Sequence, residues 1–155
     1  MHDENGSSGV RSDALQRLFV RPSFLSLTVG IPFGTYKLLF GLSALRAVSP
    51  IFGLLVVTWA LADLGMNVAR LGFDLSGRPA PFEYCTIAQL GRLLGRPTVF
   101  LAIDTLLTFV VLCLMLWTGW IGRLAPIETW LWNGATTLNL ISLSFVALYN
   151  EMRRP

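Results

Sequence analysis

The sequence predicts an all-α integral membrane protein with four transmembrane helices, short interfacial amphipathic helices and both termini in the cytoplasm. Its 155 residues are 54% hydrophobic and only 14% charged, with a mean hydropathy of +0.61. Charged residues make up about a quarter of an ordinary soluble domain. The apolar residues also form runs of about twenty, the length that crosses roughly 30 Å of hydrocarbon as a helix. The third observation is an uneven distribution of arginine between the connecting segments.

The four apolar runs cover residues 24–45, 50–71, 98–121 and 129–149. The first run is the least apolar, because it contains Lys37, Pro32 and three glycines. If all four runs cross the bilayer, nine arginines lie on the side of the termini and two, Arg46 and Arg123, lie on the other. If the first run does not cross, the basic residues divide six against six. Cytoplasmic connections carry an excess of Lys and Arg, so we expect four spans with both termini in the cytoplasm.

Two segments outside the spans show helical amphipathicity. Residues 1–11 are polar and predict a disordered tail, and residues 12–155 form the transmembrane domain. Within that domain, Ser12–Arg21 places its apolar residues on one face and predicts a helix lying in the membrane interface. The cytoplasmic loop 72–97 is rich in turn residues at its start, and its part Tyr84–Leu94 predicts a second interfacial helix.

Three arginines of this loop, Arg78, Arg92 and Arg96, are candidates for binding anionic lipid headgroups. Ordinary positive-inside anchoring explains them equally well. We expect the chain to lie in the cytoplasmic (inner) membrane of a bacterium, and the excess of Lys and Arg on one side indicates that this side faces the cytoplasm.

Three ionisable side chains fall within the spans: Lys37 in the first, Asp63 in the second and Asp104 in the third. Each costs about 2.5 to 3.5 kcal/mol at the centre of a helix, so each needs a partner. The rise per residue places Asp63 about 12 Å, Asp104 about 9 Å and Lys37 about 20 Å from the cytoplasmic ends of their helices. A lysine stem can extend toward the carboxylates. We therefore expect a Lys37–Asp63 ion pair, with Asp104 and Asn139 of the fourth span completing its hydrogen bonds.

The second span also carries a polar stripe, since Asp63, Asn67 and Arg70 follow one another at i, i+4 and i+7. Within a membrane such a stripe must face protein, water or headgroups. The intramembrane polar network has three interpretations. It fixes how the helices pack, or it lies on the path of a proton, an ion or a solute, or its long side chains extend to an interface.

Small residues on two of the spans favour close helix packing. Gly30, Gly34 and Gly41 share one face of the first span and include a Gly-x-x-x-Gly step. Gly65 with Ala69 offers a matching small step in the second span. We expect these residues to let the helices approach one another.

The sequence predicts no cofactor and no metal. Its single histidine, His2, lies in the tail, so no span offers an imidazole to haem, and the two cysteines do not form a zinc or iron–sulfur motif. The net charge of +3 comes mainly from arginines beside the spans, which fits membrane topology rather than nucleic-acid binding. No catalytic motif is present in the sequence.

The sequence therefore favours a non-catalytic membrane protein that acts as a scaffold or accessory subunit of a larger complex. Its expected partners are the lipid bilayer and either further copies of itself or other membrane subunits. The alternative is a small transporter or channel in which Asp63 or Asp104 titrates beside Lys37. A third interpretation is a lipid-modifying enzyme that uses one of these carboxylates with the cytoplasmic arginines.

Overall fold

The computed structural model describes residues 22–152, and no strand occurs in this part of the chain. The elements in order are α2 Pro22–Leu25, the π-helix η1 Ser26–Gly30, α3 Ile31–Ala47, α4 Pro50–Leu75, α5 Thr86–Leu93, α6 Pro97–Trp117, the 3-10 helix η2 Trp120–Arg123 and α7 Pro126–Met152. The first three of these run on as one continuous rod, Ser23–Ala47. The predicted helix at Ser12–Arg21 and the tail 1–11 lie outside the described residues.

Four helices are long and apolar enough to cross a membrane: Ser23–Ala47, Pro50–Leu75, Pro97–Trp117 and Pro126–Leu148. With 21 residues or more, each reaches about 30 Å at 1.5 Å per residue. Three of their ends differ from the sequence prediction by three residues or more, and one of these is the end of the second span, which runs to Leu75 rather than to residue 71. The third span ends at Trp117 rather than at residue 121, because the chain turns at Gly119, whose φ of +68° is readily adopted only by glycine. The fourth begins at Pro126, three residues early, because proline suits the first turn of a helix.

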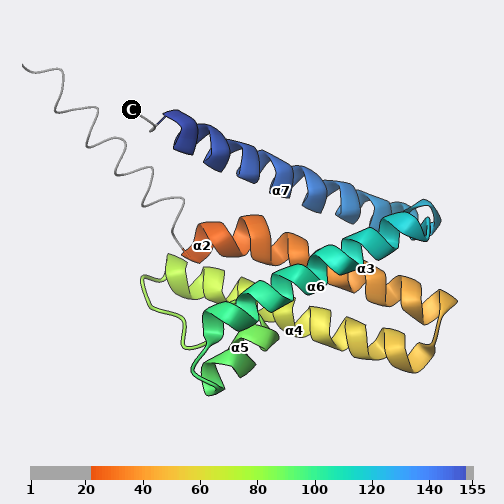
Figure 1. The fold of residues 1–155 in the computed structure, drawn as a ribbon, viewed down its shortest axis with the longest axis horizontal. Coiled ribbons are helices and arrows are strands. Elements are labelled where there is room, and N and C mark those ends of the chain that lie inside the picture. The colour runs from red at the N-terminus through yellow and green to blue at the C-terminus, as the bar shows by residue number, and fades with distance from the viewer. Residues whose placement is uncertain (1–21, 153–155) are drawn as a thin grey trace, which may run out of the picture.

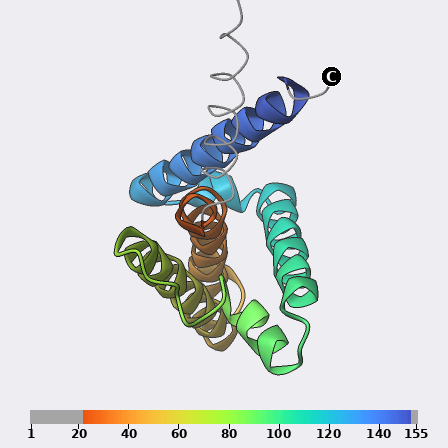
Figure 2. The ribbon, with the colours of Figure 1, turned by 90° about the vertical axis from the view of Figure 1, so that its left-hand side faces the viewer.

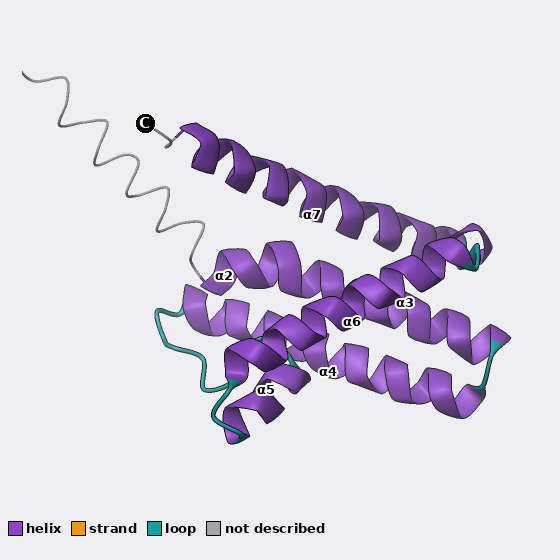
Figure 3. Ribbon diagram, in the orientation of Figure 1, coloured by secondary structure: helices purple, strands orange, loops and turns teal. Residues whose placement is uncertain are grey.

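The spans form two antiparallel hairpins, with loops only at the ends of the rods (Figures 1 and 3). The rod ending in α3 joins α4 through Val48 and Ser49, and α6 joins α7 through the segment that contains η2. The start of α2, the α4–α6 connection and the end of α7 all lie at one end of the bundle (Figure 1). Below, this is called the terminal end, and the other is the far end.

The first span occupies the centre of the bundle. Helix α3 packs against α4, α6 and α7, and Figure 2 shows it between α4 and α7 with α6 on a third side. It is also the most buried of the four spans. The run with the lowest apolar content thus has the least contact with lipid, and its lysine and glycines are accommodated because protein surrounds them.

Polarity is distributed in the opposite way to that of a soluble domain. The side chains of Lys37, Asp63 and Asp104 are buried, whereas the outer surface carries large apolar groups such as Ile51 and Leu106. A soluble protein buries its apolar residues and leaves charged ones in water. The observed pattern suits a hydrocarbon surrounding and supports an integral membrane protein.

The glycines of the first span face α4. A Cβ added at Gly30 would meet the side chain of Asn67, one at Gly34 would meet Leu64, and one at Gly41 would lie 2.9 Å from the backbone nitrogen of Val57. Gly65 does not take part in this packing, because nothing lies within 4 Å of an added Cβ there. The small step that we expected to pack against the first span thus faces outward, since Gly65 lies on the side of α4 away from Asp63 and Asn67.

Candidate intramembrane polar site

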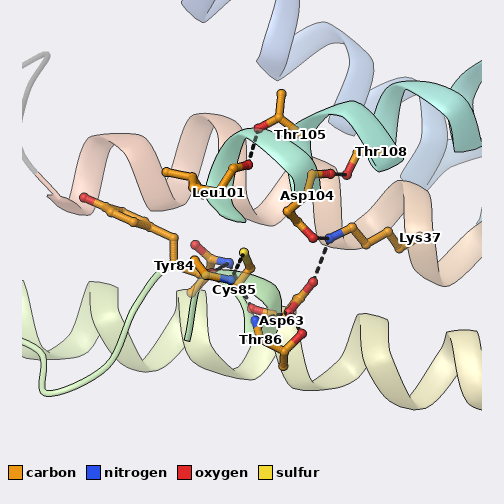
Figure 4. Close-up of polar contacts among 11 residues, drawn as sticks. Lys37, Asp63, Tyr84, Cys85, Thr86, Leu101, Asp104, Thr105 and Thr108 are labelled. Carbon is orange, nitrogen blue, oxygen red and sulfur yellow. Dashed lines mark hydrogen bonds and ion pairs between the residues drawn. The ribbon is translucent and has the colours of Figure 1, made fainter. Parts of the chain in front are cut away.

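The site is centred on the ammonium group of Lys37, which lies between two carboxylates. Lys37 Nζ donates to Asp63 Oδ2 at 2.7 Å and to Asp104 Oδ1 at 2.6 Å, so α3, α4 and α6 each contribute one charged residue (Figure 4). These residues are only 1%, 1% and 4% exposed, respectively. Nζ also lies 4.3 Å from the centre of the Trp59 ring, where a cation–π interaction adds to the stabilisation of the charge. The structure thus brings together all three ionisable residues singled out in the spans.

Asp63 is held from its other side by the start of α5. The backbone N–H of Thr86 donates to Asp63 Oδ1 at 2.7 Å, and the Thr86 hydroxyl donates to the same oxygen at 2.8 Å. The first N–H groups of a helix have no partner within the helix and attract anions. The carboxylate of Asp63 therefore accepts three hydrogen bonds, one at Oδ2 and two at Oδ1.

The polar stripe of α4 faces the segment Phe82–Thr86 that leads into α5. Asn67 Nδ2 donates to the carbonyl of Tyr84 at 2.8 Å, and Arg70 donates to the carbonyl of Phe82 at 3.1 Å. The Arg70 guanidinium also lies 3.8 Å from the centre of the Tyr84 ring. Non-helical backbone beside a membrane span needs hydrogen-bond partners from protein. The stripe therefore faces protein, rather than water or lipid headgroups.

The sequence predicts a helix at Tyr84–Leu94, but it does not predict that the beginning of this helix belongs to the site, and Thr86 in particular was missed. A signal was present, since Thr86 and Gln89 have the Ser/Thr-x-x-Glu/Gln spacing of a capping box at a helix start. In the structure the N-cap is Cys85, one residue earlier, and Gln89 Oε1 accepts from the backbone N–H of Glu83 at 2.9 Å. The spacing thus marks the beginning of α5, but it does not reveal that this beginning points at Asp63.

Asn139 does not complete the network as we expected. No hydrogen bond within the described part of the chain joins this half-buried side chain to Lys37 or to either carboxylate. The reason is the course of α7, which contacts α3 through Trp132 and through a 3.2 Å hydrogen bond from Tyr36 to Thr136. Helix α7 lies on a different side of the first span from α4 and α6, which supply the two carboxylates (Figure 2).

The three candidate headgroup-binding arginines lie apart from the polar network. Arg78, Arg92 and Arg96 are exposed in the α4–α6 connection, at the terminal end of the bundle. Arg92 donates to the carbonyl of Pro81 at 2.7 Å.

A cavity of about 140 Å³ adjoins the charged cluster between η1, α3 and α6. Its polar lining comes chiefly from Lys37, Asp63, Asn67 and Asp104, and most of its remaining wall is apolar. Asn67 Oδ1 is buried and accepts no hydrogen bond. A buried acceptor without a donor costs free energy, and this oxygen lies against Gly30.

A second ion pair joins the two hairpins at the far end. Arg46 donates to Glu128 through Nη1 at 2.8 Å and through Nη2 at 2.5 Å, and the backbone N–H of Ala125 donates to the same carboxylate at 2.9 Å. The Arg46 side chain is 53% exposed, whereas that of Glu128 is 7% exposed. Because the arginine is largely exposed, this pair contributes less than the cluster around Lys37.

Cys85 lies beside the cluster and is 4% exposed. Burial, with Asp104 adding to the effect, raises the pKa of its thiol to about 12, from 9.0 in an unfolded chain. The protonated thiol thus contributes stability that is fully present below about pH 9 and is lost as the pH rises toward 12.

We expect alkylation of Cys85 in the folded Cys113→Ser protein to be slow at pH 8, because the thiolate is the nucleophile. Its rate should keep rising about tenfold per pH unit beyond pH 9, whereas the rate in the denatured chain levels off there. Mass spectrometry of the alkylated chain gives both rates. Rapid labelling of the folded protein at pH 8 would contradict this expectation.

Among residues 22–152, no three His, Cys, Asp or Glu side chains are grouped so that they could hold a metal ion. No protein-family model, no curated protein and no solved structure matches this chain. The candidate site therefore rests on the geometry given above.

Proposed function

We propose that this membrane protein is a non-catalytic scaffold or accessory subunit that assembles through the outer face of α4, and that the first occupant of this face is a second copy of the chain. One observation carries the proposal. Small residues follow one another along the exposed side of α4 at alternating steps of four and three: Thr58, Ala62, Gly65, Ala69 and Gly72. Below, these five residues are called the small-residue stripe.

The spacing of the stripe is that of a helix–helix seam. Steps of four and three keep residues on one side of a helix over several turns, and small side chains there let two backbones approach closely. The large apolar residues that cover the neighbouring outer surface, such as Leu61 and Val68, suit lipid contact instead. Two copies related by a twofold axis would pack stripe against stripe, which is the usual geometry of homodimers.

Substitution of Gly65 by leucine tests this assembly. Nothing lies within 4 Å of a Cβ at this position, so the larger side chain fits within one copy but blocks a second helix. We expect the wild-type protein, solubilised gently, to have the mass of two or more copies, and the Gly65→Leu variant to have the mass of one. Native mass spectrometry or light scattering with the detergent contribution subtracted gives these masses.

The matched control is Gly134→Leu in α7, where the glycine is also exposed and has nothing within 4 Å of an added Cβ. It makes the same change outside the stripe and should leave the mass unchanged. A monomeric wild type would contradict self-assembly, and a complex that survives Gly65→Leu would contradict the role of the stripe. If the native complex contains one copy of this chain with other proteins, and Gly65→Leu disrupts it, the result would support the role as an accessory subunit and contradict self-association.

The second candidate function is a small transporter or channel, which the cavity beside Lys37 and Asp104 favours. It predicts a proton or ion flux into vesicles that contain the purified protein. Asp104→Asn should abolish that flux while the mass of the complex stays the same. The absence of a flux in wild-type vesicles would sink this second candidate.

The orientation is a further part of the proposal. Nine arginines at the side of the termini against two at the far side support cytoplasmic termini in a bacterial cytoplasmic membrane, with Arg78, Arg92 and Arg96 facing lipid headgroups. Labelling of cysteines introduced at each terminus with a reagent that does not cross the membrane checks it. Labelling of the termini in intact cells would contradict this orientation.

A further inference from the structure

We propose that Asp104 binds an exchangeable proton at neutral pH, and that the adjacent cavity supplies the water through which this proton is exchanged. The ligand is the proton, and the site is the buried cluster Asp63–Lys37–Asp104. This inference is independent of the proposed assembly, because it concerns the interior of one copy.

The first step of the argument is the charge of the cluster. Two carboxylates and one ammonium carry a net charge of −1, at positions no more than 4% exposed. An uncompensated charge in a low-dielectric interior is costly, and a group placed there tends to neutralise instead. One added proton makes the cluster neutral while it keeps one ion pair with Lys37.

The groups that surround Asp104 do not supply the missing charge. Lys37 from α3 is shared with Asp63 from α4, and the Cys85 thiol ahead of α5 is a neutral, weak donor. The next cation along α4, Arg70, stacks on the Tyr84 ring and donates to the carbonyl of Phe82. The compensating charge therefore has to come from outside the cluster.

The second step decides which acid takes the proton. Both oxygens of Asp63 are occupied as acceptors, since Oδ2 accepts from Lys37 and Oδ1 accepts from both the N–H and the hydroxyl of Thr86. Asp104 accepts from Lys37 through Oδ1 at 2.6 Å and otherwise meets the Cys85 thiol. A carboxylate with three strong donors holds its charge better than one with a single strong donor. The proton therefore binds at Asp104.

The third step is access. The cavity of about 140 Å³ is lined by Asp104, Lys37 and Asn67, and by the apolar side chains of Leu25, Val29 and Phe33 among others. A cavity of this size has room for more than one water. Because Asp104 lines the cavity, a water held in it can exchange the proton of this carboxyl.

A metal cation suits the cavity less well. Hard cations take about six or more oxygen ligands. Of the two acids that line the cavity, Asp63 already accepts three hydrogen bonds, which leaves the carboxylate of Asp104 as the main ligand. The proton needs one acceptor only, and Asp104 provides it.

Infrared spectroscopy of the whole protein in lipid vesicles tests for the proton directly. Exposed carboxyls are ionised at pH 7, so a protonated carboxyl absorption at this pH reports a buried acid. We expect this absorption in the wild type, its loss in Asp104→Asn and its disappearance as the pH is raised. A wild-type spectrum without it overturns the proposal. An absorption that appears only after sodium is removed also overturns it, in favour of a bound cation.

The matched pair Asp104→Asn and Asp63→Asn identifies the acid. Asparagine has the shape of a protonated aspartic acid, so Asp104→Asn should unfold within about 2 °C of the wild type near pH 7. At alkaline pH this variant should be the more stable of the two, because the wild type then loses its proton. Asp63→Asn loses an acceptor of three donors and should unfold at least about 5 °C lower.

The reverse order of the two variants would overturn the assignment to Asp104. If neither variant folds, Asp104→Glu still identifies the protonated acid, because the carboxyl of glutamic acid absorbs at a different infrared frequency from that of aspartic acid. A protonated absorption that stays unmoved in Asp104→Glu would then also overturn the assignment.

Discussion

Lys37→Met is expected to destabilise the protein more than any other single substitution considered above. It removes the ammonium group that Asp63 and Asp104 share, at distances of 2.7 and 2.6 Å, and leaves two buried acids facing each other. Removing one partner of a buried ion pair costs about 3–5 kcal/mol. The same change removes a link between three helices. Unfolding followed by circular dichroism in detergent, with increasing denaturant, measures the loss.

Arg46→Met provides the control for this prediction. It also replaces a basic side chain that binds a carboxylate, but the Arg46 side chain is 53% exposed, and exposed pairs contribute about 0–1 kcal/mol. The loss of unfolding free energy in Lys37→Met should become smaller as the pH falls, because both acids can then take protons. A loss in Lys37→Met no larger than that in Arg46→Met would mean that the cluster does not hold the helices together.

Gly53→Ala is expected to have the second largest effect. Gly53 is buried at the start of α4, and an added Cβ would lie 2.6 Å from the Cα of Leu45 and closer still to its backbone nitrogen. Because these are backbone atoms, the two helices must move apart. Overpacking of this kind costs about 1–3 kcal/mol. The same unfolding measurement applies.

Gly65→Ala on the same helix is the matched control. There an added Cβ meets nothing within 4 Å, so the substitution should stabilise the helix by about 0.5–1 kcal/mol through its better propensity. The measurement is made on monomer, in enough detergent to separate the copies, so that any effect on assembly is excluded. Equal effects of the two substitutions would show that α3 and α4 do not pack as closely as described.

The sequence predicts the four apolar helices correctly, because their length and composition alone specify them. The pairing of Lys37 with acids also follows from the sequence, since a charge within a span needs a partner and few are available. The distribution of arginine predicts that the first run crosses the membrane despite its lysine, and in the structure this run forms the central helix of the bundle.

The remainder of the site depends on helix rotation and helix placement, which one sequence does not specify. The sequence predicts that Gly65 and Ala69 pack against the first span. The rotation of α4 that buries Asp63 and Asn67 instead turns these two residues outward. Asn139 has the depth to join the cluster, but α7 packs on a different side of the first span from α4 and α6, which supply the two carboxylates (Figure 2). Thr86 is distant from Asp63 in sequence, and only the course of segment 82–86 brings its N–H to the carboxylate.

The short turn between the first two spans has a consequence for biogenesis. Lys37 and Asp63 lie on adjacent helices joined by only Val48 and Ser49, and their side chains meet at 2.7 Å. Chains emerge from the ribosome N-terminus first. This hairpin can therefore enter the lipid with the charges of Lys37 and Asp63 already paired, before the helix that carries Asp104 follows.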